Sequence, residues 1–332
     1  MSGTVQKVPV DLLTGFLGSG KTTLLRRLLT DPALADTAVL INEFGAVGLD
    51  HLLVETVDPD TYLLSSGCIC CSIRDDLAAA LRELWDKRER GLLPPFRRVV
   101  IETTGLADPT PVLAILTSEP MLRWHLRIGR VVATIDALAG AATLAAHDES
   151  RRQVAVADRL VVTKADLVES AALAALEAEL RGINPSADIL HARHGELADA
   201  PALLTSPNDT REVRRWLAYE PAPARHGAIG SFLLEADQPI EWAAFGVWLS
   251  LLLHRHGSRI LRVKGLVHIQ GRDLPVVIQG VQHVVHPPEH LPAWPEGGQG
   301  TRLVFIGVEL DPPAIRRSFS TFQLLGDRVL GG

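Results

Sequence analysis

The sequence lacks any apolar run near the roughly 18 residues that a membrane-spanning helix needs, so no membrane association is expected. It also lacks a basic excess: 33 Lys and Arg stand against 39 Asp and Glu, and this net charge of −6 argues against non-specific nucleic-acid binding. Residues 1–7 have no apolar core of the kind found in signal peptides, which predicts a cytoplasmic location. Cysteine is scarce, with three in the chain, but all three fall within four positions.

The 332 residues suffice for two domains, and an apolar content of 47% is that of an ordinary folded protein. Apolar strands alternate with helical stretches through the first two thirds, which predicts a parallel α/β sheet with helices on both faces. Turn residues then indicate a linker, followed by a smaller α+β domain. We therefore expect a first domain at 1–205, a linker at 206–227 and a C-terminal domain at 228–332.

The predicted strands of the first domain are 8–13, 37–41, 61–64, 99–101, 130–135, 160–163 and 188–191. The second domain should contain strands at 228–235, 259–267, 275–281 and 302–308, with a closing helix from Pro312. Their close spacing suits an antiparallel sheet with helices on one side. Between the first two of these strands, Trp242, Phe245, Leu249 and Leu252 mark the expected buried face of a helix.

The first chemical motif is a phosphate-binding loop of the pattern G-x-x-x-x-G-K-[ST] between a strand and a helix. Such a loop points backbone N–H groups and a helix N-terminus at a polyphosphate. Lys21 is expected to reach the β- and γ-phosphates, and the Thr22 hydroxyl to ligate Mg²⁺. The expected nucleotide-binding residues of this segment are Gly15, Gly18, Ser19, Gly20, Lys21, Thr22 and Thr23.

Two further strand ends fit a nucleotide site. The strand at 99–101 ends in Glu102, with Gly105 three positions later, where phosphate-loop enzymes place a Mg²⁺- or water-orienting carboxylate and a γ-phosphate-sensing N–H. Thr163-Lys164-Ala165-Asp166 resembles the N-K-x-D motif of GTPases, with Thr163 in place of Asn. Asp166 can accept both N1–H and the 2-amino group of guanine, whereas adenine would leave it unpaired, so the motif favours GTP over ATP. We expect the loss of Asn to remove a structural anchor.

The cysteine cluster is the second chemical motif. Chance would place three cysteines this close together on the order of once in 10⁴ chains. Cys68, Cys70 and Cys71 precede a predicted helix, whose N-terminus lowers thiol pKa, and thiolates are soft ligands for zinc and similar ions. A fourth ligand position remains for Glu43, a histidine, water or a partner's ligand. Buried thiols and a redox switch are the alternative interpretations. The twelve histidines match no compact zinc motif, and no role is assigned to them.

Together these segments resemble the CobW-type metallochaperone GTPases. The resemblance rests on 15–23, 42–45, 67–71, 102–105 and 163–166, in that order, and extends through the second domain. It implies slow GTP hydrolysis, with Lys21 and Glu102 as catalytic residues, a GTP/GDP cycle with Mg²⁺, and delivery of Zn²⁺ or Co²⁺ to a metal-requiring client protein. A homodimer is compatible with the sequence. Ala46 departs from the acidic residue expected in many members.

Two alternative functions stay open on the sequence. One is a sensory or structural metal-binding protein that uses nucleotide only for stability, and the other is a small-molecule kinase. The sequence does not identify the metal, the client or the water-activating residue.

Overall fold

The computed structural model describes residues 7–41, 63–65, 73–194, 196–204, 229–295 and 299–330. The chain divides into two compact units, one formed by 1–177 with 187–206 and the other by 178–186 with 207–332. The predicted linker at 206–227 lies outside the described residues, so the predicted domain boundaries stay a prediction. No described helix is long and apolar enough to cross a membrane.

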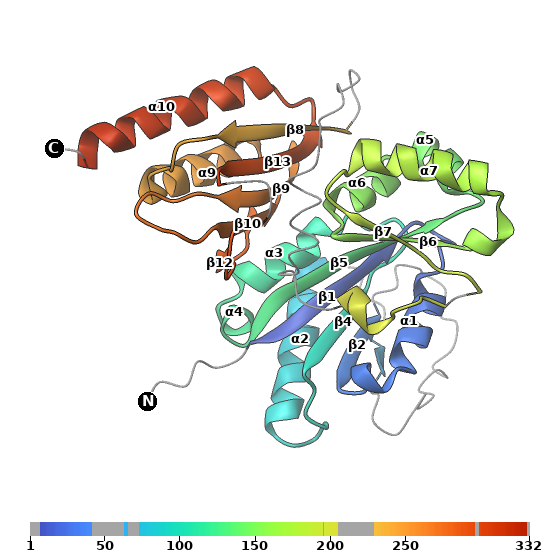
Figure 1. Cartoon of the computed structure of the whole chain (residues 1–332). Helices are drawn as coiled ribbons and strands as arrows, with labels where there is room; N and C mark the ends of the chain where they lie inside the picture. Colours follow the sequence, from blue (N-terminus) through green and yellow to red (C-terminus); the bar gives the residue numbers. More distant parts are fainter. Residues whose placement is uncertain are drawn as a thin grey trace. The chain divides into compact units, whose positions relative to one another are not determined.

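The first unit contains a parallel seven-stranded sheet in the order β3-β2-β4-β1-β5-β6-β7 (Figure 1). Every strand predicted for this domain is present, although β5 begins four residues earlier than expected. Its strands are β1 (Val8–Gly15), β2 (Thr37–Ile41), β3 (Leu63–Ser65), β4 (Arg98–Glu102), β5 (Leu126–Asp136), β6 (Arg159–Thr163) and β7 (Asp188–His191). Buried Val, Ile and Leu dominate these strands, as both faces are covered.

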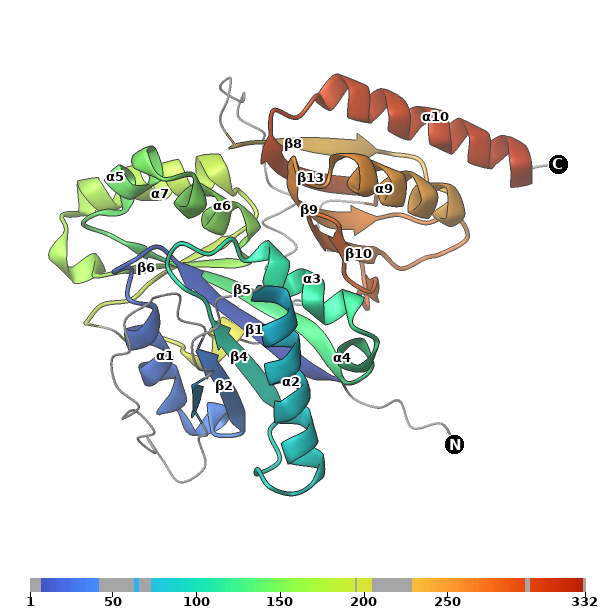
Figure 2. The ribbon, with the colours of Figure 1, turned by 180° about the vertical axis from the view of Figure 1, so that it is seen from behind.

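Helical elements cover both faces of this sheet. The leucines of α1 and of the 3-10 segment η3 form one apolar cluster with Leu13, Val100 and Val132. Helix α2 crosses in front of the strands in Figure 2 and behind them in Figure 1, so it covers the opposite face. The helices are α1 (Lys21–Leu29), α2 (Ile73–Glu89), α3 (Thr110–Ser118), α4 (Pro120–His125), α5 (Gly140–Ala146), α6 (Asp148–Val156) and α7 (Ser170–Ile183), with 3-10 turns η1 (Pro32–Leu34), η2 (Ala165–Leu167) and η3 (Pro201–Leu204). The predicted fold class is confirmed.

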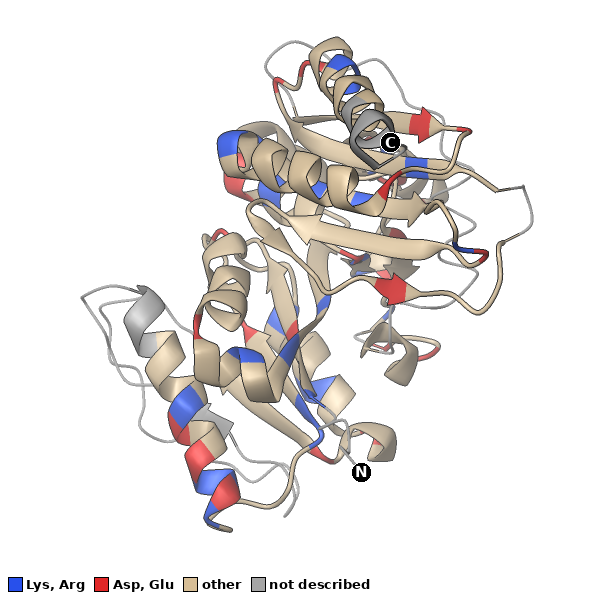
Figure 3. Ribbon diagram, turned by 90° about the vertical axis from the view of Figure 1, so that its left-hand side faces the viewer, with Lys and Arg blue, Asp and Glu red and all other residues tan. Residues whose placement is uncertain are grey.

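Charged side chains of opposite sign are interspersed along α2, as Figure 3 shows. Lys87 pairs with Glu83 at 2.7 Å and Arg90 with Asp86 at 3.0 Å, both at the i,i+4 spacing of a solvated helix face. The buried face of α2 carries Leu77, Leu81, Leu84 and Trp85 instead. This separation fixes which side of the helix lies on the sheet.

The second unit contains an antiparallel sheet in the order β11-β10-β9-β13-β8, with β12 paired to β10. Two helices, α9 and α10, pack on one face, as predicted (Figure 1). The elements are β8 (Ile229–Ala236), α9 (Trp242–His256), β9 (Ile260–Val267), β10 (Val276–Val281), β11 (Val284–Val285), β12 (Glu289–His290), β13 (Thr301–Val308) and α10 (Pro312–Leu330).

An aromatic cluster forms the core beneath these helices. Phe305 of β13 stacks on Phe232 of β8 with ring centroids 5.0 Å apart, and Trp248 packs edge-on against Phe319 of α10. The prediction that Trp242 lies on the buried face of α9 is wrong, since its side chain is 39% exposed. Trp242 is the first residue of α9. It has the spacing of the buried residues, but the sheet does not fully cover this end of the helix.

Candidate functional site

The phosphate-binding loop connects β1 to α1 at the carboxyl edge of the parallel sheet. Gly20 caps α1 with φ of 89°, in the left-handed region that favours glycine. Lys21 is buried, and its Nζ donates hydrogen bonds to the carbonyl oxygens of Gly15 at 2.9 Å and Phe16 at 3.1 Å. Burial lowers the pKa of Lys21, an effect that the charge of Glu102 opposes. A polyphosphate in the loop would add negative charge beside this ammonium and favour its charged form.

The acidic residue predicted at the end of β4 meets the loop. Strands β1 and β4 are neighbours, with Leu13 in register with Glu102. The Thr22 hydroxyl donates to Glu102 Oε1 at 2.6 Å. Sequence positions 80 residues apart thus bring a hydroxyl and a carboxylate together, and both are oxygen ligands of the kind that Mg²⁺ prefers. Thr23, the next residue of α1, is exposed.

Gly105 lies against the phosphate-binding loop. A Cβ atom built on Gly105 would come within 2.6 Å of the Leu17 backbone nitrogen, so only glycine permits this approach. Its carbonyl accepts a hydrogen bond at 3.0 Å from Gln153 Nε2, which also donates to the Ala107 carbonyl at 3.1 Å. Gln153 is buried on α6. The loop after β4 is therefore held between α6 and the phosphate-binding loop.

Thr163 connects the predicted base-recognition motif to the phosphate-binding loop. Its hydroxyl donates to the Ser19 carbonyl at 2.8 Å, and the Ser19 hydroxyl bonds Thr134 on β5 at 2.6 Å. Lys164 Nζ donates to the Gly18 carbonyl at 3.2 Å. The expectation that replacing Asn by Thr163 removes a structural anchor is therefore wrong, because the threonine hydroxyl makes the connection itself.

Two residues that the motif search missed complete this end of the site. Lys164 Nζ lies 2.5 Å from Asp136 Oδ2, at the end of β5. The His194 backbone N–H donates to Asp166 Oδ1 at 3.0 Å, and its ring Nδ1 lies 3.1 Å from Oδ2. The backbone hydrogen bond from His194 holds the pKa of Asp166 below its usual range. Both residues follow parallel strands, so a search of every strand end, rather than of known motifs, finds them.

The predicted metal ligands Glu43, Cys68, Cys70 and Cys71 lie outside the described residues. The described strands that precede them are neighbours: β2 ends at Ile41 and β3 at Ser65, and these two residues are in register. Within the part of the chain that the structure describes, no group of three His, Cys, Asp or Glu side chains is arranged to hold a metal ion.

Two family models match the chain, and they cover the two sheets. Residues 9–191 match the CobW/HypB/UreG nucleotide-binding domain, and residues 229–323 match the C-terminal domain of the cobalamin synthesis protein CobW. The chain belongs to the CobW family. This confirms the resemblance seen in the sequence motifs, and it assigns the loop at Gly15–Thr22 to the nucleotide-binding domain.

Several characterised proteins are similar to this CobW-family chain over nearly its whole length. The zinc chaperone YjiA of Escherichia coli is 32% identical over 94% of this chain and 98% of the relative. The zinc chaperone CobW of Pseudomonas aeruginosa is also 32% identical, over 96% of this chain and 92% of the relative. Among solved structures, Zn(II)-bound YjiA GTPase from E. coli superimposes with a TM-score of 0.68 at 27% identity, covering 96% of this chain and 99% of that one.

Proposed function

We propose that this CobW-family chain hydrolyses GTP and uses the nucleotide cycle to bind a transition metal ion, Zn²⁺ or Co²⁺, and deliver it to a client protein that requires the metal. The observation that carries the nucleotide half is the hydrogen bond from Thr163 to the Ser19 carbonyl, at 2.8 Å. It joins the segment that carries Asp166, the proposed guanine-binding carboxylate, to the phosphate-binding loop across 144 residues of sequence. The relatives named as zinc chaperones support the metal half.

The described side chains give the first unit its chemistry. Lys21 exchanges the Gly15 and Phe16 carbonyls for phosphate oxygens, and a phosphate raises its lowered pKa again, because it stabilises the charged form. The Thr22 hydroxyl and the Glu102 carboxylate provide the oxygen donors for Mg²⁺. When bound, Mg²⁺ supplies positive charge for the phosphoryl oxygens. Lys21 and Glu102 are the proposed catalytic residues.

The proposed metal site depends on how few residues separate the predicted ligands from two paired strand ends. Glu43 follows Ile41 by two residues and Cys68 follows Ser65 by three, and Ile41 and Ser65 are paired. A strand residue spans about 3.3 Å, so chain length permits Glu43 and the three cysteines to share one ion. Because β2 adjoins β4, with Ile41 in register with Glu102, a ligand that moves the end of β4 would act on the strand that leads to Glu43 as well.

The test compares GTP hydrolysis with and without stoichiometric Zn²⁺ or Co²⁺, and metal content under GTP and GDP. We expect metal to change the hydrolysis rate, and Cys70→Ala to remove that change while leaving metal-free hydrolysis intact. Equal rates with and without metal, together with a silent Cys70→Ala, would reject the coupling. A variant with serine at 68, 70 and 71 should lose the metal in both nucleotide states.

The same assays separate the alternatives. A protein that uses nucleotide only for stability would bind GTP without hydrolysing it, and Glu102→Ala would then change nothing. In a small-molecule kinase, ATP would compete with GTP for the nucleotide site. Transfer to a client and homodimer formation belong to the same proposal and require a client protein and a measurement of oligomeric state, respectively.

A further inference from the structure

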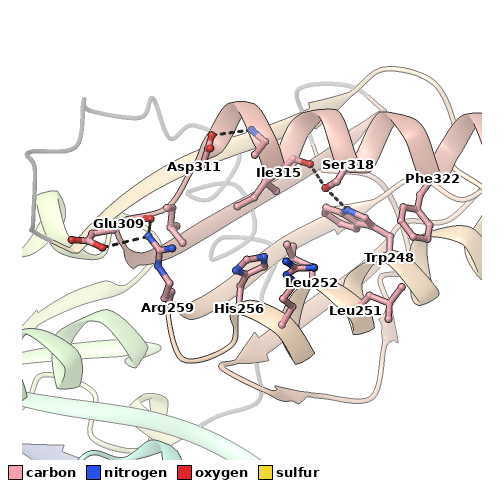
Figure 4. A pocket seen from close by; sticks show the side chains of 13 residues that line it. Trp248, Leu251, Leu252, His256, Arg259, Glu309, Asp311, Ile315, Ser318 and Phe322 are labelled. Atoms are coloured by element: carbon pink, nitrogen blue, oxygen red, sulfur yellow. Dashed lines mark hydrogen bonds and ion pairs between the residues drawn. The ribbon is translucent and has the colours of Figure 1, made fainter.

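A groove of about 520 Å³ lies between α9 and α10 of the second unit (Figure 4). The two helices run antiparallel beside each other and are joined by Trp248 Nε1, which donates to Ser318 Oγ at 3.0 Å. Trp248 and Phe322 lie toward one end of the groove, and Arg259 and Glu309 toward the other (Figure 4). Nothing in the nucleotide site uses these residues.

The groove has the dimensions of a short helix. Its lining on α9 recurs every three or four residues from Trp248 to His256, and on α10 from Ala314 to Phe322. Each set spans about two helical turns, or roughly 12 Å at 1.5 Å per residue. Two parallel rows of side chains at this spacing form the kind of track in which an amphipathic helix lies.

The apolar side of the groove is open to solvent. Leu251 is 53% exposed and Val247, one turn earlier on α9, is 52% exposed. Val247 lies outside the groove lining, so the apolar strip continues past the cavity along the helix. A small ligand that filled the cavity would leave Val247 in water, whereas a helical segment would cover both residues.

The charged end of the groove favours an acidic partner. Asp311 Oδ1 accepts the Ala314 backbone N–H at 2.9 Å and so caps α10, and Arg259 bonds both the carbonyl and the carboxylate of Glu309. Among the described residues, the exposed guanidinium of Arg255 has no hydrogen-bond or ion-pair partner. A carboxylate on an incoming chain can form a bidentate pair with it.

We propose that this groove docks an amphipathic helix of a partner protein, with apolar residues spaced three and four apart and an acidic residue at the end that meets Arg255. Leu251 and Phe322 form the apolar contact surface, and Arg255 fixes the direction of the bound helix. The docking site goes beyond metal delivery, because it needs neither nucleotide nor metal to exist. If the groove binds no helix, the proposal of GTP hydrolysis is unaffected, because none of the nucleotide-site residues lines the groove.

The experiment uses the full chain, immobilised, to select from a phage-displayed library of random peptides of about four helical turns, on the order of 15 residues. We expect enriched sequences with apolar residues at the i, i+3/i+4, i+7 spacing and Asp or Glu at one end. A labelled enriched peptide should bind the wild-type chain, and Leu251→Asp should weaken that binding by about tenfold or more. Arg255→Glu should weaken it too, and should bind more tightly a peptide in which Lys replaces the acidic residue.

The matched control is Leu92→Asp, which introduces the same charge at a leucine that is 66% exposed in the first unit. It should leave peptide binding unchanged, and GTP hydrolysis should be the same in all these variants. Denaturant titration should give Leu251→Asp and Arg255→Glu the wild-type unfolding transition of the second unit, which shows that this unit still folds. The proposal is overturned if no sequence is enriched, if enriched peptides bind Leu251→Asp as tightly as wild type, or if their charged end is basic. It is also overturned if sedimentation shows a wild-type dimer that Leu251→Asp dissociates, because the groove then holds a second copy of this chain.

Discussion

The two units differ in where some of their buried polar side chains lie. In the first unit Ser19, Glu102 and Thr163 lie where parallel strands end, and each is bonded to another segment of the same edge. In the second unit Lys264 and Gln279 are buried in mid-strand, opposite each other on β9 and β10. Parallel strands bring all their carboxyl ends to one edge, whereas antiparallel strands alternate them between two edges. The first unit can therefore assemble a reaction site from strand ends, and the second offers the surface of its helices.

The largest expected effect is a loss of GTP hydrolysis, the proposed activity of the first unit, without a change in the second unit. Lys21→Ala should lower the rate of GTP hydrolysis by about 10³-fold or more, because the ammonium that we propose meets the transferring phosphoryl group is lost. Single-turnover hydrolysis measures this. Lys87→Ala is the matched control, since Lys87 makes only an exposed ion pair with Glu83 on α2. A Lys21→Ala rate within tenfold of wild type would contradict the assignment.

A substitution in the core of the second unit should lower stability and leave GTP hydrolysis unchanged. Phe305→Ala removes a fully buried ring between Phe232 and Trp248 and should lower the free energy of unfolding of this unit by about 3–5 kcal/mol. Denaturant titration measures the loss, and Phe305→Leu, which keeps more of the apolar volume, should cost less. Phe305 does not line the groove, and GTP hydrolysis should be retained below the transition. Loss of hydrolysis under native conditions would show that the two units do not function separately.

A smaller change tests whether Thr163 links the two halves of the nucleotide site. Thr163→Val keeps the shape but removes the hydroxyl that donates to Ser19, and it should weaken GDP binding by about tenfold, since a buried carbonyl loses its partner. Isothermal titration measures the affinity. Thr163→Ser restores the hydroxyl and should recover most of it. Equal affinities for Val and Ser would show that the hydroxyl has no part in binding.

The smallest effect concerns pH. The pKa of Asp166 is lowered from the ordinary 3.8, first by the backbone hydrogen bond from His194, so the ionised form is favoured in the folded chain. The resulting stabilisation is fully present above pH 3.8 and is lost as the pH falls through the lowered pKa. The difference in unfolding free energy between the wild type and Asp166→Asn should therefore be constant near neutrality and shrink in acid. Denaturant titrations across that range check this, and a difference that persists unchanged into acid would contradict it.

The sequence predicted the strands well because each is a short run of Val, Ile and Leu between turn residues. The ends of β2 and β7 were predicted to the residue, and the strand ends located Glu102 and Thr163 correctly. The extra length of β5 was missed because Leu126 to Gly129 follow α4 directly, with no turn residues to separate them. The register of β1 with β5 also shifts between Val10 and Leu12, which no local pattern indicates.

The candidate site was predictable where chemistry follows from a motif, and not where it depends on a distant partner. Lys21 and Thr22 are fixed by their spacing from the glycines. The partners Asp136, Gln153 and His194 lie 28 to 48 residues from the groups they bond, in segments without a recognised pattern. The exposure of Trp242 was missed for a related reason, since helical periodicity gives the direction of a side chain but not the extent of the surface that covers it.

Gln153 attaches the loop after β4 to α6. One amide nitrogen bonds two carbonyl groups, those of Gly105 and Ala107. Rotation of that one amide would break both hydrogen bonds at once, so this segment can lose the two contacts only in a single step.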